Sequence, residues 1–152
     1  MELKDLITAA LSVTALVVSA LTFALSYRHN LRIAVSGRKP VLVFAYDGNR
    51  GWVLSNVGSG PALNIIIAQK RVGGEWFNPV RVPALAKDAE YIPKWLGHVN
   101  TTGLGATYTD AEGSCYSSTC GNDLSRVHKG AVFGPWGESE IGRDWNQPVY
   151  HD

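Results

Sequence analysis

Two cysteines, Cys115 and Cys120, are the side chains best suited to redox or metal chemistry. Their odd spacing would put them on opposite faces of one continuous β-strand, because side chains alternate along a strand. A disulfide would require the strand to end before Cys120, and it remains the alternative for an exported domain. A metal site completed by His98 or His128 lacks the paired ligand spacing of zinc sites. The pattern therefore predicts free thiols and no metal.

Nucleophilic catalysis would need a serine, a base and an acid, which Ser117 or Ser118, His98 and Asp110 could supply by type alone. No Gly-x-Ser-x-Gly motif stands in the sequence, and a chain of 152 residues contains these residue types without any catalytic purpose. Three histidines of the C-terminal half are scattered, and each is expected at the surface: His98, His128 and His151. We therefore expect no enzyme.

The sequence contains no motif for cofactor or nucleic-acid binding either. The pair Gly103 and Gly105 lies between β-type runs with no helix after it, so it does not predict a phosphate cradle. The net charge is only +1, which is not the basic field of a general nucleic-acid binder. No cofactor and no nucleic-acid partner are expected.

Aromatic residues near the C-terminus are the better candidates for function. Trp136, Trp145 and Tyr150 stand among glycines, prolines and charges in residues 121–152, a segment read as an extended tail without periodicity. Tryptophan is enriched in interface anchors, so these three rings are candidates for docking on a partner. The alternative is that they fold back onto the chain's own domain.

The N-terminal segment must position all of these groups relative to a bilayer. Leu6 to Tyr27 is a run of 22 residues without charge, glycine or proline. As a helix it would span about 33 Å, the thickness of a hydrocarbon core. A cleaved signal peptide is the alternative, with Ala24 and Ser26 at a suitable cleavage position, but the run is long and its N-terminal flank is not positive. We expect a single transmembrane helix within residues 1–29.

The charges that flank this segment predict its direction. Lys4 precedes it together with two acids, whereas four basic residues and no acid follow before Asp47: Arg28, Arg32, Arg38 and Lys39. Positive flanks stay on the cytoplasmic side and meet anionic headgroups there. The sequence predicts an N-terminus outside and a cytoplasmic domain at a bacterial inner membrane.

Small and hydroxyl residues recur at helical spacing along the segment and share one face: Thr8, Ser12, Ala15, Ser19, Thr22 and Ser26. Such a face lets transmembrane helices approach closely and form hydrogen bonds with each other. In the alternative, the hydroxyls bond to carbonyls one turn back in their own helix. The segment holds no His, Cys or charged residue, so it offers no haem or pigment ligand.

After the segment, short β-type runs alternate with turn residues. Strands are expected at residues 41–46, 52–57, 62–72, 75–82, 89–92, 106–109 and 114–118. The run 62–72 is apolar on both faces at its centre and is expected inside its sheet, and 89–92 at an edge. Candidate core residues are Tyr46, Trp52, Ile66, Tyr108 and Tyr116. The pattern favours an all-β immunoglobulin-like sandwich over residues 30–120.

Two stretches, residues 52–64 and 108–118, resemble bacterial single-pass membrane proteins with a small immunoglobulin-like domain, in which Asn-x-Gly-x-Gly-Pro-Ala and Tyr-x-Asp-x-x-Gly-x-x-Tyr segments form turns. The resemblance covers residues 1–120. It implies that Gly58 and Gly60 adopt positive φ and that Asn56 caps the turn. It also implies a binding or scaffolding role and no catalytic residue.

These observations together predict a non-catalytic accessory subunit. Its helix would pack against other transmembrane helices in the lipid bilayer, and its β-domain would pack on a larger bacterial membrane complex. A respiratory or photosynthetic energy-transducing assembly is one such host. The alternative is an independent membrane-tethered sensor that binds a ligand or peptide.

Overall fold

The structure is a computed structural model that describes residues 3–36, 38–96, 101–121 and 124–144. The chain divides into two compact units, Met1–Gly37 and Arg38–Asp152. The first is one helix and the second is built of strands.

Helix α1, Leu3–Ser36, is 34 residues long. Within it, Leu11–Arg28 has a mean hydropathy of 1.5 over 18 residues, and none of this window is buried. Apolar side chains are exposed around the helix, among them Leu16, Val17 and Phe23. The first unit is therefore long and apolar enough to span a membrane, as the sequence predicts.

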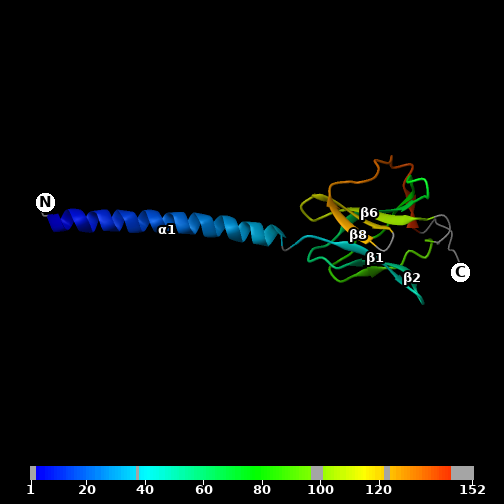
Figure 1. The fold of residues 1–152 in the computed structure, drawn as a ribbon, viewed down its shortest axis with the longest axis horizontal. Helices are drawn as coiled ribbons and strands as arrows, with labels where there is room; N and C mark the ends of the chain where they lie inside the picture. The colour runs from blue at the N-terminus through cyan, green and yellow to red at the C-terminus, as the bar shows by residue number, and fades with distance from the viewer. Residues whose placement is uncertain (1–2, 37, 97–100, 122–123, 145–152) are drawn as a thin grey trace. The chain divides into compact units, whose positions relative to one another are not determined.

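The second unit contains two sheets (Figure 1). The smaller sheet has the order β1-β2-β5, with β1 Leu42–Asp47, β2 Gly51–Asn56 and β5 Glu90–Tyr91. The larger sheet has the order β8-β7-β6-β3-β4-β9. Its strands are β3 Leu63–Lys70, β4 Trp76–Arg81, β6 Gly103–Thr109, β7 Cys115–Gly121, β8 Leu124–Lys129 and β9 Gly142–Arg143. All pairings are antiparallel except that of β4 with β9.

Both sheets contribute to one hydrophobic core. Leu42, Phe44 and Leu54 come from the smaller sheet, and Ile65, Ile67, Val80, Leu104, Ala106 and Tyr108 from the larger one. The hydroxyl of Tyr108 accepts a hydrogen bond from the Leu42 N–H at 3.3 Å and meets Ser118 Oγ at 2.9 Å, which joins the sheets through a buried polar contact. The predicted two-sheet β-domain is confirmed, as is the central position of β3.

Two predicted core residues lie outside the core. Ile66 is half-buried, between the core residues Ile65 and Ile67 of β3. Tyr46 is 51% exposed, although it shares the strand face of Leu42 and Phe44. It lies in the last pairs before the β1–β2 turn, opposite Trp52, where the strands extend past the core. The two rings meet edge to face with centroids 5.4 Å apart, so Tyr46 packs on its neighbour and not inside the domain.

Asn56 closes the turn after β2, as the resemblance implies. Its side-chain NH₂ donates to the carbonyl oxygens of Gly60, Leu85 and Ala86 at 2.8, 3.1 and 3.1 Å. Its Oδ1 accepts from the N–H groups of Val41 and Gly58 at 3.2 and 3.1 Å. The side chain is 1% exposed, and this buried amide ties three chain segments together.

The positive φ predicted for Gly58 and Gly60 is wrong, because neither residue adopts that conformation. The structure shows another reason for glycine here. A Cβ on Gly60 would lie 1.7 Å from the carbonyl oxygen of Arg38, and a Cβ on Gly58 would lie 2.3 Å from the backbone nitrogen of Val41. The two glycines let the chain entering β1 pass directly against the turn.

The segment after residue 120 differs from the predicted extended tail. Leu124–Lys129 forms β8, which pairs with β7 over six residues, and Gly142–Arg143 forms β9 beside β4. The β8 side chains are exposed or half-buried on both faces, so no apolar alternation marks the strand in the sequence. The domain therefore continues beyond the predicted boundary at residue 120.

Candidate binding groove

A groove runs across the outer face of the larger sheet, with a volume of about 620 Å³. Its floor follows from the pairing of four strands. In one row across the sheet, Lys70 on β3 faces Gly103 on β6, then Gly121 on β7, then Leu124 on β8. Because the two middle residues have no side chain and the outer two are large, the row itself forms a trough.

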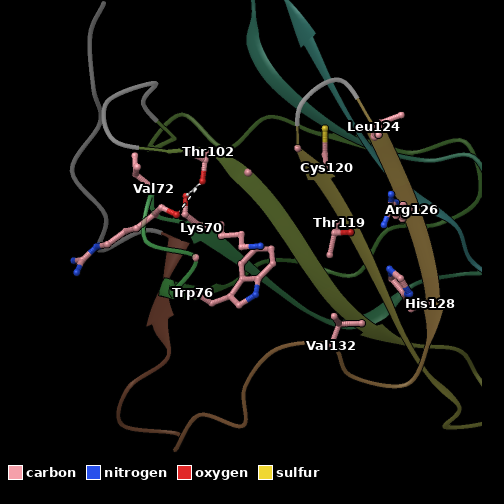
Figure 2. Close-up of a pocket in the computed structure, with 14 residues that line it drawn as sticks. Lys70, Val72, Trp76, Thr102, Thr119, Cys120, Leu124, Arg126, His128 and Val132 are labelled. Atoms are coloured by element: carbon pink, nitrogen blue, oxygen red, sulfur yellow. Dashed lines mark hydrogen bonds between the residues drawn. The ribbon is translucent and has the colours of Figure 1, made fainter.

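Basic side chains stand on both sides of this trough (Figure 2). Lys70 lies over the ring of Trp76, with Nζ 5.6 Å from the ring centroid, and forms one wall with it. Arg126 and His128 come from β8 on the other side, and Thr119 lies between the walls. The described residues that line the groove include no Asp or Glu.

An aromatic cluster closes one end of the groove. The ring of Phe133 stacks on Trp76 with centroids 4.4 Å apart, and Trp136 lies against Phe133 at 5.5 Å. Gly105 makes this cover possible, since a Cβ there would lie 2.5 Å from the Phe133 ring and 2.7 Å from the Trp76 ring. The segment that carries Phe133 is fastened by Ser117, whose hydroxyl donates to the Gly130 carbonyl at 2.6 Å.

Cys115 and Cys120 both lie on β7, which runs unbroken from one to the other. They are free, half-buried thiols and occupy opposite faces, as predicted. The Cys120 side chain packs against the hydrophobic core, on the face of β7 opposite Thr119 and Gly121, although the groove reaches its residue. Cys115 does not line the groove. Among the described residues, no three His, Cys, Asp or Glu side chains are grouped so that they could hold a metal ion.

The residues considered for a catalytic triad have structural partners instead. Ser117 and Ser118 are buried neighbours on β7, and Ser118 bonds to Tyr108. Asp110 accepts hydrogen bonds from the N–H groups of Glu112 and Ser114 and from the Tyr116 hydroxyl, at 2.9, 2.8 and 3.1 Å. Burial opposes its charge, but these donors outweigh it and lower the pKa of Asp110. His98 and His151 lie outside the described residues.

The C-terminal part that the structure describes is bound to its own domain. The Asp144 carboxylate accepts hydrogen bonds from the Tyr91 hydroxyl and from Trp95 Nε1, the latter at 3.0 Å. Burial, together with the Asp144 carboxylate, raises the pKa of Tyr91. Of the predicted docking residues, Trp136 is half-buried against Phe133, and Trp145 and Tyr150 lie outside the described residues.

Along α1, the residues of the small-residue face are exposed where their side chains are described: Ser12, Ala15, Ser19, Thr22 and Ser26. Thr22 Oγ1 donates to the Val18 carbonyl at 2.8 Å, the bond to the preceding turn that the alternative reading expected. Arg28, Arg38 and Lys39 are exposed. The side chains of Thr8 and Arg32 are not among those described.

The groove residues Lys70, Trp76 and Arg126 escaped the sequence analysis. The only local signal was the pair Gly103 and Gly105, which was considered as a phosphate-binding motif and rejected. These glycines form part of the groove only when β3, β6, β7 and β8 pair in one register, and no local sequence pattern indicates that pairing.

Comparisons with models of known protein families, with curated proteins and with solved structures found no match. The function therefore has to be argued from the helix and the groove.

Proposed function

We propose that this protein is a non-catalytic, membrane-anchored accessory subunit that joins a larger bacterial membrane complex through its helix and its β-domain. The observation that carries the proposal is the exposure of α1. The 18-residue window Leu11–Arg28 has a mean hydropathy of 1.5, and no part of it is buried. Lipid and neighbouring helices are the surroundings that suit such a surface.

The small-residue face gives the helix a side suited to other helices. Ser12, Ala15 and Ser19 follow each other at spacings of three and four residues, so they share one side of a helix with 3.6 residues per turn. A neighbouring helix can pack closely against these small side chains and make more van der Waals contact with them than lipid chains do. Thr22 is already bonded to its own helix, so packing contributes more to this face than interhelical hydrogen bonds.

The basic residues after the apolar window support a cytoplasmic β-domain. Arg28, Arg38 and Lys39 are exposed and can lie among anionic headgroups at that face of the bilayer. The finer assignment of the two sheets as an immunoglobulin-like sandwich, and the bacterial family that it suggests, belong to the same proposal. A respiratory or photosynthetic assembly is one host that would use such a brace.

The experiment is co-purification of the tagged full chain from native membranes in mild detergent. A variant with Ser12→Leu, Ala15→Leu and Ser19→Leu should lose its partners, because the added side chains hold a neighbouring helix away. A control with Val13→Leu, Val17→Leu and Ala20→Leu adds bulk on the opposite side of the helix and should keep them. Partners retained equally by both variants would refute a role for the small-residue face.

The second candidate function is a membrane-tethered binding module. One observation favours it: the β-domain has a concave groove with an aromatic wall formed by Trp76 and cations on both sides. A chain that is monomeric in detergent and binds a soluble ligand would support this candidate over the accessory subunit.

A further inference from the structure

We propose that the groove on the larger sheet binds an acidic, extended segment of a partner protein. The inference rests on the proposed function, because it assigns the surface and the chemistry by which the β-domain holds its partner. The occupant is identified by charge, by the spacing of the cations and by the apolar rim of the groove.

Charge is the first argument. Lys70 and Arg126 line the groove together with His128, and no described lining residue is an acid. Arg71 borders the groove, but its guanidinium lies over the ring of Phe77, 4.5 Å from the centroid. The whole chain carries a net charge of only +1, so this positive charge is a local concentration and not a general property of the surface. The ion pairs of the domain lie elsewhere, such as Arg50 with Glu90 and Arg81 with Glu138. A concave basic surface attracts an acidic ligand.

Spacing is the second argument. Lys70 on β3 and Arg126 on β8 are separated by β6 and β7, so the two strands stand about 14 Å apart at the usual strand separation. Arg126 also lies two residues along β8 from Leu124, the residue in the same row as Lys70. A single inorganic anion between them would be far from at least one wall. Several carboxylates on one polypeptide can reach both walls, since alternate side chains of an extended segment point to opposite sides.

The rim is the third argument. Val72, Leu124 and Val132 line the groove and are 80%, 59% and 48% exposed. A polypeptide that places apolar side chains beside its acids would cover them, whereas phosphate would leave them in water. The trough is also hollow, and a flat bilayer surface cannot enter it. The near-neutral chain lacks the extended basic field that nucleic acid requires.

Thr119 allows a direct test because it lies on the floor of the groove, between the two walls. The full chain carrying Cys115→Ser, Cys120→Ser and Thr119→Cys, held in uncharged detergent, is treated with a neutral maleimide in the presence of a short synthetic peptide of alternating Glu and Leu. The peptide should slow alkylation of the thiol at position 119. In the matched Cys120→Ser variant, which keeps Thr119, alkylation of Cys115 should be unchanged, because Cys115 does not line the groove.

The charge dependence is tested in the same assay. Lys70→Glu with Arg126→Glu should weaken the peptide's affinity about tenfold, since two exposed attractions become repulsions. Lys70→Gln with Arg126→Gln is the milder variant and should weaken it less. Lys87→Glu with Lys94→Glu makes the same change of net charge at exposed residues outside the groove and should leave the affinity unchanged. Protection should also decline as salt is raised.

Several results would overturn the inference. Equal protection by a peptide with Lys in place of Glu would show that charge does not govern binding. Stronger protection by inorganic phosphate, by phosphatidylglycerol vesicles or by an RNA oligomer would assign the groove to that ligand. Unchanged protection in the Lys70 and Arg126 variants would remove the basic walls from the binding site.

Co-purification separates this inference from the proposed function. If the Lys70→Glu, Arg126→Glu chain keeps its membrane partners and the Ser12, Ala15, Ser19 variant loses them, the accessory role stands and the groove assignment fails. If the unaltered chain brings no partner but binds the acidic peptide, the accessory role fails.

Discussion

Replacing Asn56 should damage the domain more than any other single polar substitution described above. Its NH₂ group has two hydrogens, which three carbonyl oxygens share, and its Oδ1 accepts from two N–H groups. Each net hydrogen bond contributes about 1 kcal/mol, so four of them set a scale of about 4 kcal/mol. Water entering the space would recover part of this, and we expect Asn56→Ala to lower the free energy of unfolding by about 2 to 3 kcal/mol.

Asn56→Asp is the sharper variant because it keeps the shape of the side chain. One carboxylate oxygen would then face the carbonyl oxygens of Gly60, Leu85 and Ala86, where the amide had donated. Burying an unpaired charge costs more than losing a neutral hydrogen bond, so this variant should be less stable than Asn56→Ala at neutral pH. At acid pH the carboxyl gains a proton, and the difference in unfolding free energy between Asn56→Asp and Asn56→Ala should become smaller.

Urea unfolding of the full chain in mild detergent, followed by tryptophan fluorescence, measures both variants. All five tryptophans lie in the β-domain, so the signal reports that unit alone. Asn49→Ala and Asn49→Asp make the same changes at an exposed turn residue whose hydrogen bond to Asp47 uses only its backbone N–H. An Asn56→Asp chain as stable as the unaltered protein would refute the reasoning.

Three further predictions concern the rings, the tyrosine and the thiols. Gly105→Ala should destabilise the domain by about 1 to 3 kcal/mol because its Cβ would enter the stacked rings, whereas Gly48→Ala, with open space around it, should be nearly neutral in the same urea assay. The pKa of Tyr91 in the folded protein is raised above 10.0, so the stability that its hydroxyl contributes is complete below that pH and is lost as the pH rises through the folded pKa. Tyr91→Phe should therefore lower the urea midpoint at neutral pH and reduce the loss of stability at alkaline pH. A mild oxidant should form no bond between Cys115 and Cys120 in the folded chain, and mass spectrometry showing one would contradict their placement on opposite faces of β7.

The elements that the sequence predicted well are those whose signals are local. The turn between β1 and β2 is formed by Asp47, whose Oδ1 accepts from the N–H groups of Asn49 and Arg50 at 2.8 and 3.2 Å. The turn between β6 and β7 is formed in the same way by Asp110. Because such contacts span only a few residues, the residue types alone indicate both hairpins.

The elements that the sequence missed depend on distant contacts. Strand β8 has exposed side chains on both faces and forms only because β7 offers an edge. Gly58 and Gly60 are explained by the backbone of Arg38 to Val41, and Gly105 by the rings of Trp76 and Phe133. The groove needs four strands in one register before Lys70 and Leu124 face each other across Gly103 and Gly121.

The central claim is that an exposed helix and a β-domain together attach this protein to a membrane complex. The most direct measurement is the set of polypeptides that co-purify with the tagged full chain from native membranes in mild detergent, with their stoichiometry. The account predicts a fixed set of membrane proteins, lost with Ser12→Leu, Ala15→Leu and Ser19→Leu and kept with Val13→Leu, Val17→Leu and Ala20→Leu. A chain that elutes alone, as a monomer with no stoichiometric partner, would contradict it.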